Sequence, residues 1–199
     1  MSINMKQIIL RTLLCATLAA VTACGGVPLR AIPRLVQMQN ELLDTNPAEF
    51  MVALQVDARF VPPPGAVPFL IIKVVPNDPS AFEAVDKKLP LQVSVASVAT
   101  LGLEAPPPSR RWLIYSLPPA TQAEMQRIQS VMLRAKAMPN GKGAGSLSMG
   151  VAQDSLAITE PALANTRWDT WLQTKQRDGF FEVWVGTPAQ IQSLAAKAK

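Results

Sequence analysis

The sequence contains no histidine, and its 199 residues include only two cysteines and one tyrosine. Histidine is the commonest general base near neutral pH and a frequent metal ligand, so its absence removes the usual centre of both kinds of site. The motifs typical of serine hydrolases and zinc proteases are also missing. We therefore expect no cofactor, no metal and no catalytic residue, and a function other than that of an enzyme.

A glycine-rich segment at 140–146 is the closest approach to a phosphate-binding loop. The Walker pattern requires four residues between its first glycine and Gly-Lys-Ser/Thr, on a turn from a strand into a helix. Here the spacing differs, and the segment is expected to run from a helix into a strand. We interpret it as a flexible connection.

The N-terminus is polar over residues 1–7, where it carries Lys6, and an apolar run follows over 8–21, before Thr22, Ala23 and Cys24. A positive start, a short apolar stretch and small residues at the cleavage point are typical of a secretory signal. Cysteine after one aliphatic and two small residues closely resembles the lipobox of bacterial lipoproteins. The resemblance covers residues 1–25 and predicts a processing route.

This resemblance implies a lipid attached to Cys24 as the first residue of the mature chain. The residue after Cys24 is Gly25 and not an aspartate. In Gram-negative lipoproteins this pattern implies transport to the outer membrane, with the domain on the periplasmic side. An inner-membrane or extracellular location is the alternative, as is an ordinary cleaved signal, and Met5 is an alternative start. A membrane-spanning helix is disfavoured, because Arg11 interrupts a run that is shorter than the roughly 20 residues required.

We accordingly divide the chain into a signal peptide at 1–23, a lipidated flexible tether at 24–34 and one domain at 35–199. Cys15 leaves with the signal, so a lipidated Cys24 leaves no free thiol and no disulfide. Removing Lys6 and Arg11 from the 19 basic residues leaves 17 against 14 acidic ones, a net charge of +3. Positive charge is concentrated at 105–150, where a solvated basic face is the simplest interpretation.

Hydrophobic periodicity predicts an α+β fold, mainly an antiparallel sheet with helices on one face. Apolar residues with a period of two, or in a continuous run, predict strands, and those with helical spacing predict helices. The expected strands are 50–60, 69–75, 91–95, 112–117, 147–151 and 180–185. The expected helices are 34–44, 121–138, 161–177 and 188–199. Thr121 and Glu124 have the spacing of a capping box at the start of the second helix.

Carboxylates are scattered along the chain, and two merit inspection as acids of a sugar-cleaving site. Asp154 stands beside Ser155, and Asp169 lies between two tryptophans. A pair of acidic groups from distant parts of a chain is sufficient for glycoside hydrolysis. A carboxylate-dependent hydrolase is therefore one alternative function.

The most prominent candidate interaction surface combines Trp168 and Trp171 with the basic pair Arg110 and Arg111. Three residues apart on the expected helix, the two tryptophans would share one side, with Trp168 nearer the surface. Tryptophan and arginine dominate interface hot spots. We expect a docking component of an envelope machine of the secretion or conjugation type, with other envelope proteins as partners. The alternative is a module that binds cell-wall glycan or lipid, and export disfavours a nucleic-acid partner.

Overall fold

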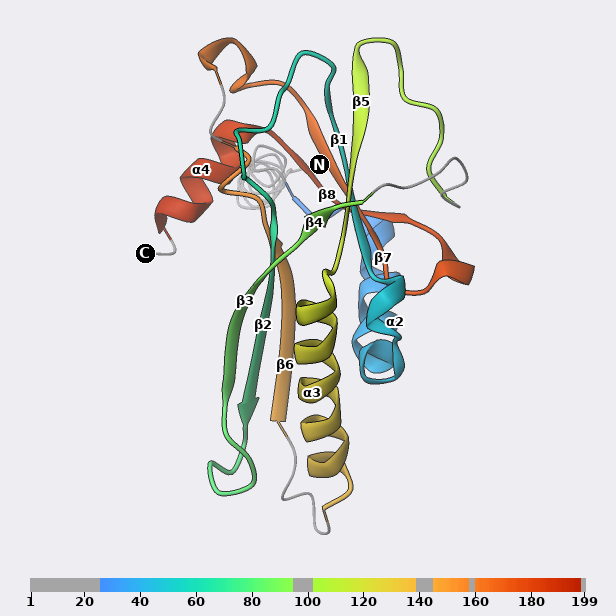
Figure 1. The fold of residues 1–199 in the computed structure, drawn as a ribbon, viewed down its shortest axis with the longest axis vertical. Coiled ribbons are helices and arrows are strands. Elements are labelled where there is room, and N and C mark those ends of the chain that lie inside the picture. Colours follow the sequence, from blue (N-terminus) through green and yellow to red (C-terminus); the bar gives the residue numbers. More distant parts are fainter. Residues whose placement is uncertain (1–25, 95–101, 139–144, 158–159, 198–199) are drawn as a thin grey trace, which may run out of the picture.

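The structure is a computed structural model that describes residues 26–94, 102–138, 145–157 and 160–197 (Figure 1). Its described part confirms the α+β expectation, with strands arranged as two antiparallel sheets. The glycine-rich segment falls largely at 139–144, outside the described residues, as do Cys24 and Gly25.

The larger sheet has five strands with β1 (Met51–Asp57) at its centre. Val52, Leu54 and Val56 point into the core, while Ala53, also fully buried, faces the opposite side. Ala53 is covered because its small side chain stands between those of its partners in the two neighbouring strands, Ile114 and Trp171. In order across the sheet, the strands are β4 (Gln92–Val93), β5 (Arg110–Ser116), β1, β7 (Trp168–Gln173) and β8 (Phe181–Gly186).

The smaller sheet has β2 (Phe69–Pro76) between β3 (Val85–Pro90) and β6 (Gly145–Ala152). Leu70, Ile72 and Val74 of β2 are buried in alternation, as the sequence predicts for a strand with one face in the core. Helix α3 (Pro119–Lys136) runs alongside this sheet in Figure 1. Its buried Met125 and Ile128 belong to the same apolar cluster as the β2 residues.

The N-terminal segment belongs to the folded domain from Gly26 onward, which corrects the flexible tether expected over 24–34. Gly26 forms an antiparallel bridge with Val185, and Arg30 forms an ion pair with the buried Glu182. Helical structure follows directly as η2 (Leu29–Ala31), α2 (Ile32–Glu41), η3 (Leu42–Asp44) and η4 (Pro47–Glu49).

The helix expected at 161–177 is wrong. Its start signal produces only the short turn η6 (Pro161–Leu163), after which the chain extends as β7 and turns again at η7 (Gln176–Asp178). The terminal helix is present as α4 (Pro188–Lys197). The single strand expected at 91–95 is replaced by β3 and the two-residue β4, on either side of the buried Leu91.

The expected capping box at the start of α3 is also absent. The helix begins at Pro119, and its N-cap residue Pro118 makes no side-chain hydrogen bond. Thr121 is buried inside the first turn, where its hydroxyl donates to the carbonyl oxygen of Pro90 at 3.1 Å. Glu124 instead accepts hydrogen bonds from Arg127 at 2.9 Å. Two prolines therefore set the start of this helix, because proline suits its first turn.

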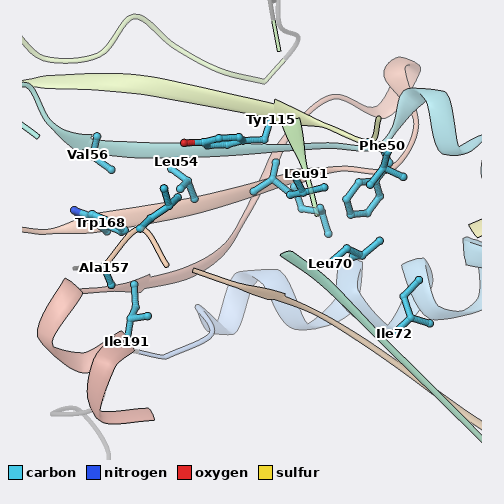
Figure 2. Packing of buried hydrophobic residues seen from close by; sticks show 14 of the residues in the cluster. Phe50, Leu54, Val56, Leu70, Ile72, Leu91, Tyr115, Ala157, Trp168 and Ile191 are labelled. Carbon is cyan, nitrogen blue, oxygen red and sulfur yellow. The ribbon is translucent and has the colours of Figure 1, made fainter. Parts of the chain in front are cut away.

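One apolar core joins the two sheets and the helices. Figure 2 shows Leu54 and Trp168 of the larger sheet, Leu70 of the smaller one and Ile191 of α4 within this cluster. Trp168 is fully buried and meets Phe60 edge to face, with ring centroids 4.9 Å apart.

Candidate functional site

The expected tryptophan surface does not exist, because Trp168 and Trp171 lie on a strand and point to opposite faces of it. Trp168 is buried in the core, and Trp171 is half-buried on the other side, hereafter the outer face of the five-stranded sheet. There its ring meets that of Trp112, with centroids 5.9 Å apart. The expectation that Trp168 lies nearer the surface is therefore wrong.

The basic pair Arg110 and Arg111 is divided in the same way. Arg110 lies on the outer face, where its Nη1 donates to Asp169 at 2.5 Å and to the side chain of Gln55 at 2.6 Å. Arg111 donates to the carbonyl oxygen of Phe60. Both guanidinium groups hold parts of the domain together, so they do not form a shared basic surface with the tryptophans.

Asp154 and Asp169, the two candidate acids of a sugar-cleaving site, lie in different surroundings. Asp169 is buried on the outer face, where it accepts hydrogen bonds from Arg110 and, at 2.7 Å, from Arg167. The bond to Asp169 raises the pKa of the Arg167 guanidinium. Asp154 follows β6 and lines an apolar cavity. Within the described part of the chain, no cluster of three or more acidic or cysteine side chains is placed to hold a metal ion.

Within the described residues, this cavity combines a volume of about 530 Å³ with mostly apolar walls. It lies where α2, α4, the free edge of β6 and the β7–β8 pair come together. Ligand pockets commonly have volumes of about 300–1,000 Å³ and mostly apolar walls. The lining residues are Val27, Leu35, Met38, Met149, Gly150, Val151, Ala152, Gln153, Asp154, Thr170, Leu172, Val183, Trp184, Ile191, Leu194 and Ala195.

The walls of the cavity are apolar and come from segments far apart in the sequence. Leu35 and Met38 come from α2, Met149 and Val151 from β6, and Ile191 from α4. Two further lining residues, Val27 and Leu194, are 50% and 54% exposed, which places apolar side chains between the cavity and solvent.

Gln153, Asp154 and Thr170 bring polar side-chain atoms to the lining of the cavity. Gln153 is 6% exposed, and its Nε2 donates to the hydroxyl of Thr170 at 2.8 Å. The Oε1 atom of Gln153 and the Oδ1 atom of Asp154 are buried and have no hydrogen-bond partner within the described residues. A buried polar atom without a partner is costly in free energy and requires an explanation.

Among the lining residues, only Asp154 is a candidate from the sequence, as an acid of a sugar-cleaving site. The apolar spacing of Leu35, Met38, Met149 and Val151 was visible, but it predicts only that these side chains face the interior. A small residue at an inward-facing position, Ala195 one helical turn after the buried Ile191, is the signal in the sequence for space left unfilled.

Comparisons with protein-family models, curated proteins and solved structures find no match to this chain. In the described part of the chain, none of the helices combines the length and apolarity needed to span a membrane.

Proposed function

We propose that this chain is an envelope lipoprotein, attached to the membrane through a lipid on Cys24, whose domain binds the aliphatic chain of a lipid. The observation that carries the proposal is the 530 Å³ cavity with apolar walls. This makes lipid binding, an alternative at the level of sequence, the leading function.

The volume fits one long aliphatic chain. A water molecule occupies about 30 Å³ of liquid, and a methylene group is of similar size, so the cavity holds on the order of 17 such groups. Each methylene moved from water into apolar surroundings contributes about 0.8 kcal/mol. A chain of ten or more methylenes therefore supplies roughly 8 kcal/mol before the cost of association is subtracted.

The position of the cavity in the chain agrees with lipid attachment at Cys24. Val27 lines the cavity and lies three residues after this cysteine. Three residues span at most about 11 Å when fully extended. A lipid on Cys24 would therefore hold the cavity within reach of a bilayer, on the periplasmic face of the outer membrane if Gly25 directs transport there.

Docking onto another envelope protein is the second candidate, and it is favoured by a specific observation. Leu29 and Ile32, which follow Val27, are 83% and 46% exposed. Exposed apolar side chains that lie together commonly mark a contact surface. Trp168 has no part in this second candidate, because it is buried.

A cavity-filling substitution tests lipid binding. Ala195 lines the cavity and lies one helical turn after the buried Ile191, another lining residue, so Ala195→Phe adds a ring on the side of α4 that borders the cavity. Ala196→Phe is the matched control, because it makes the same change at the next residue of α4, which is exposed and does not line the cavity.

The full chain is reconstituted in phosphatidylcholine vesicles with a hexadecyl probe that carries a photoreactive diazirine in its chain. We expect crosslinks at lining residues of β6 and α4, reduced at least fivefold by Ala195→Phe and unchanged by Ala196→Phe. Crosslinks spread evenly over the surface, or equal labelling of the two variants, would refute lipid binding in the cavity.

Lipid attachment has a separate test. Cys24→Ser removes the sulfur that would carry the diacylglycerol, so we expect the variant to accumulate as the uncleaved precursor or, if cut elsewhere, in the soluble fraction. Membrane fractionation with an antibody to the domain measures this. Mature Cys24→Ser protein in the outer-membrane fraction would contradict the anchor.

A further inference from the structure

Two buried oxygen atoms without partners lie in consecutive residues that line the apolar cavity, Oε1 of Gln153 and Oδ1 of Asp154. We infer that the cavity selects a long-chain amphiphile whose polar end donates hydrogen bonds, an aliphatic amine or alcohol, over a fatty acid. This inference rests on the proposed function, since it names the chemistry of the ligand for the same cavity.

Neighbouring contacts restrict the amide of Gln153. Its Nε2 donates to Thr170, a residue of β7 that is 1% exposed and also lines the cavity. With that nitrogen engaged, the amide presents its oxygen as an acceptor. Buried side-chain oxygens are nearly always hydrogen-bonded in folded proteins, so a donor supplied by a ligand accounts for this one.

Asp154 adds a negative charge to the same wall. Its Oδ2 forms an ion pair with Nζ of Lys88 at 3.7 Å, too far for a hydrogen bond, and its side chain is 37% exposed, while its buried Oδ1 has no partner among the described residues. The ammonium group of Lys88 also lies over the ring of Phe69. Among the described residues that line the cavity, Asp154 is the only ionisable one.

The charge of Asp154 determines which polar end is favoured. An ammonium group donates hydrogen bonds and is attracted by the carboxylate, and a hydroxyl donates without a charge. The carboxylate of a fatty acid can only accept at neutral pH, and it would be repelled by Asp154. A methyl ester also lacks a donor, but it carries no charge. The expected order of affinity is therefore amine, alcohol, methyl ester and fatty acid.

The test is competition against the photoreactive hexadecyl probe on the full chain in phosphatidylcholine vesicles. Hexadecylamine, hexadecanol, methyl palmitate and palmitate share one chain length and differ in their polar ends. We expect the amine and the alcohol to displace the probe at concentrations on the order of tenfold lower than the ester, the difference that one hydrogen bond to a buried acceptor makes. Palmitate is expected to be the weakest.

Two variants assign the preference to the two residues. Asp154→Asn removes the charge and should bring the amine and palmitate at least fivefold closer together. Asp86→Asn is its matched control, an exposed carboxylate on β3 outside the cavity, and should leave the order unchanged. Gln153→Leu should abolish the advantage of the alcohol over the ester. Because Gln153 is buried, circular dichroism checks its fold, and Asp154→Asn alone suffices if that variant unfolds.

The outcomes separate the inference from the proposed function. Equal displacement by all four compounds, or strongest displacement by palmitate, would overturn the donor preference while leaving lipid binding in place. Absence of any crosslink at lining residues would overturn both. The expected order in the wild type, with the difference between the amine and palmitate at least fivefold smaller in Asp154→Asn and unchanged in Asp86→Asn, would support the inference.

Discussion

Replacing Asp169 by asparagine should destabilise the domain by about 2–4 kcal/mol. Asp169 is 4% exposed and accepts from both Arg110, at 2.5 Å, and Arg167, at 2.7 Å. Asparagine has one acceptor oxygen in place of two, and it removes the charge that compensates these guanidinium groups. The side chain of Arg110 is only 16% exposed, so it would remain as a partly buried cation.

The expected magnitude follows from the groups that remain. Breaking a buried ion pair by removing one partner typically costs about 3–5 kcal/mol. Arg110 keeps hydrogen bonds to both oxygens of Gln55 and to the carbonyl oxygen of Arg167, and Arg167 itself is 63% exposed. These contacts reduce the cost toward the lower part of the range. For a domain of this size, each kcal/mol lowers the melting temperature by roughly 2–4 °C.

Urea unfolding of Asp169→Asn, Arg110→Met and the double variant measures the loss of stability in each. The double-mutant cycle gives the coupling free energy between Asp169 and Arg110, which we expect to be about 1–3 kcal/mol. Asp86→Asn is the control, because Lys73 and Asp86 form an exposed pair at 3.0 Å that contributes at most about 1 kcal/mol. If Asp169→Asn costs no more than Asp86→Asn, the idea that this charge cluster stabilises the outer face is refuted.

Two further predictions concern stability. Thr121→Ala should lower the free energy of unfolding by about 1 kcal/mol, because the hydrogen bond to Pro90 is lost. Glu124→Ala should lower it by less, because the ion pair between Glu124 and Arg127 is partly exposed. Equal melting temperatures for Thr121→Ala and wild type would contradict the first prediction. Burial raises the pKa of Tyr115 from its usual value near 10 to about 12. Because the folded state favours the neutral phenol, its contribution is complete below pH 10 and is lost as the pH rises toward 12. Tyr115 is the only tyrosine, so the absorbance of tyrosinate follows its titration, and a midpoint near 10 in the folded protein would refute the burial effect.

Where local pattern and burial agree, the sequence was sufficient to predict the elements. The alternation in β1 and the apolar run of β2 predict strands because one or both faces of each enter the core. Proline also marked the start of α4 correctly. The predicted capping box is wrong because the Thr121 hydroxyl donates to the carbonyl oxygen of Pro90, at the end of β3. The spacing of residues along the helix cannot reveal a contact between such distant parts of the chain.

The predicted tryptophan surface is wrong because the segment was assigned the period of a helix and has the period of a strand. Positions 168 and 171 share a side at 3.6 residues per turn, but they lie on opposite faces at a period of two. Within β7, Trp168, Thr170 and Leu172 are buried toward the core, and Asp169 and Trp171 lie on the outer face. The β-branched and aromatic residues at 168–171 favour a strand, whereas Pro161 favours the start of a helix. The helix prediction follows the proline and not these residues.

The cavity is a harder case, because an apolar pattern predicts which side chains face inward but not whether they fill the space between them. Leu35 of α2, Val151 of β6 and Ile191 of α4 would show the same spacing in a fully packed core. Whether a gap remains depends on side-chain volume at facing positions, since interiors are otherwise close-packed. Ala195, on the same side of α4 as Ile191, is a small residue of this lining, and it leaves volume that a larger side chain would occupy. The size of these side chains, and not their polarity, separates a ligand cavity from a core.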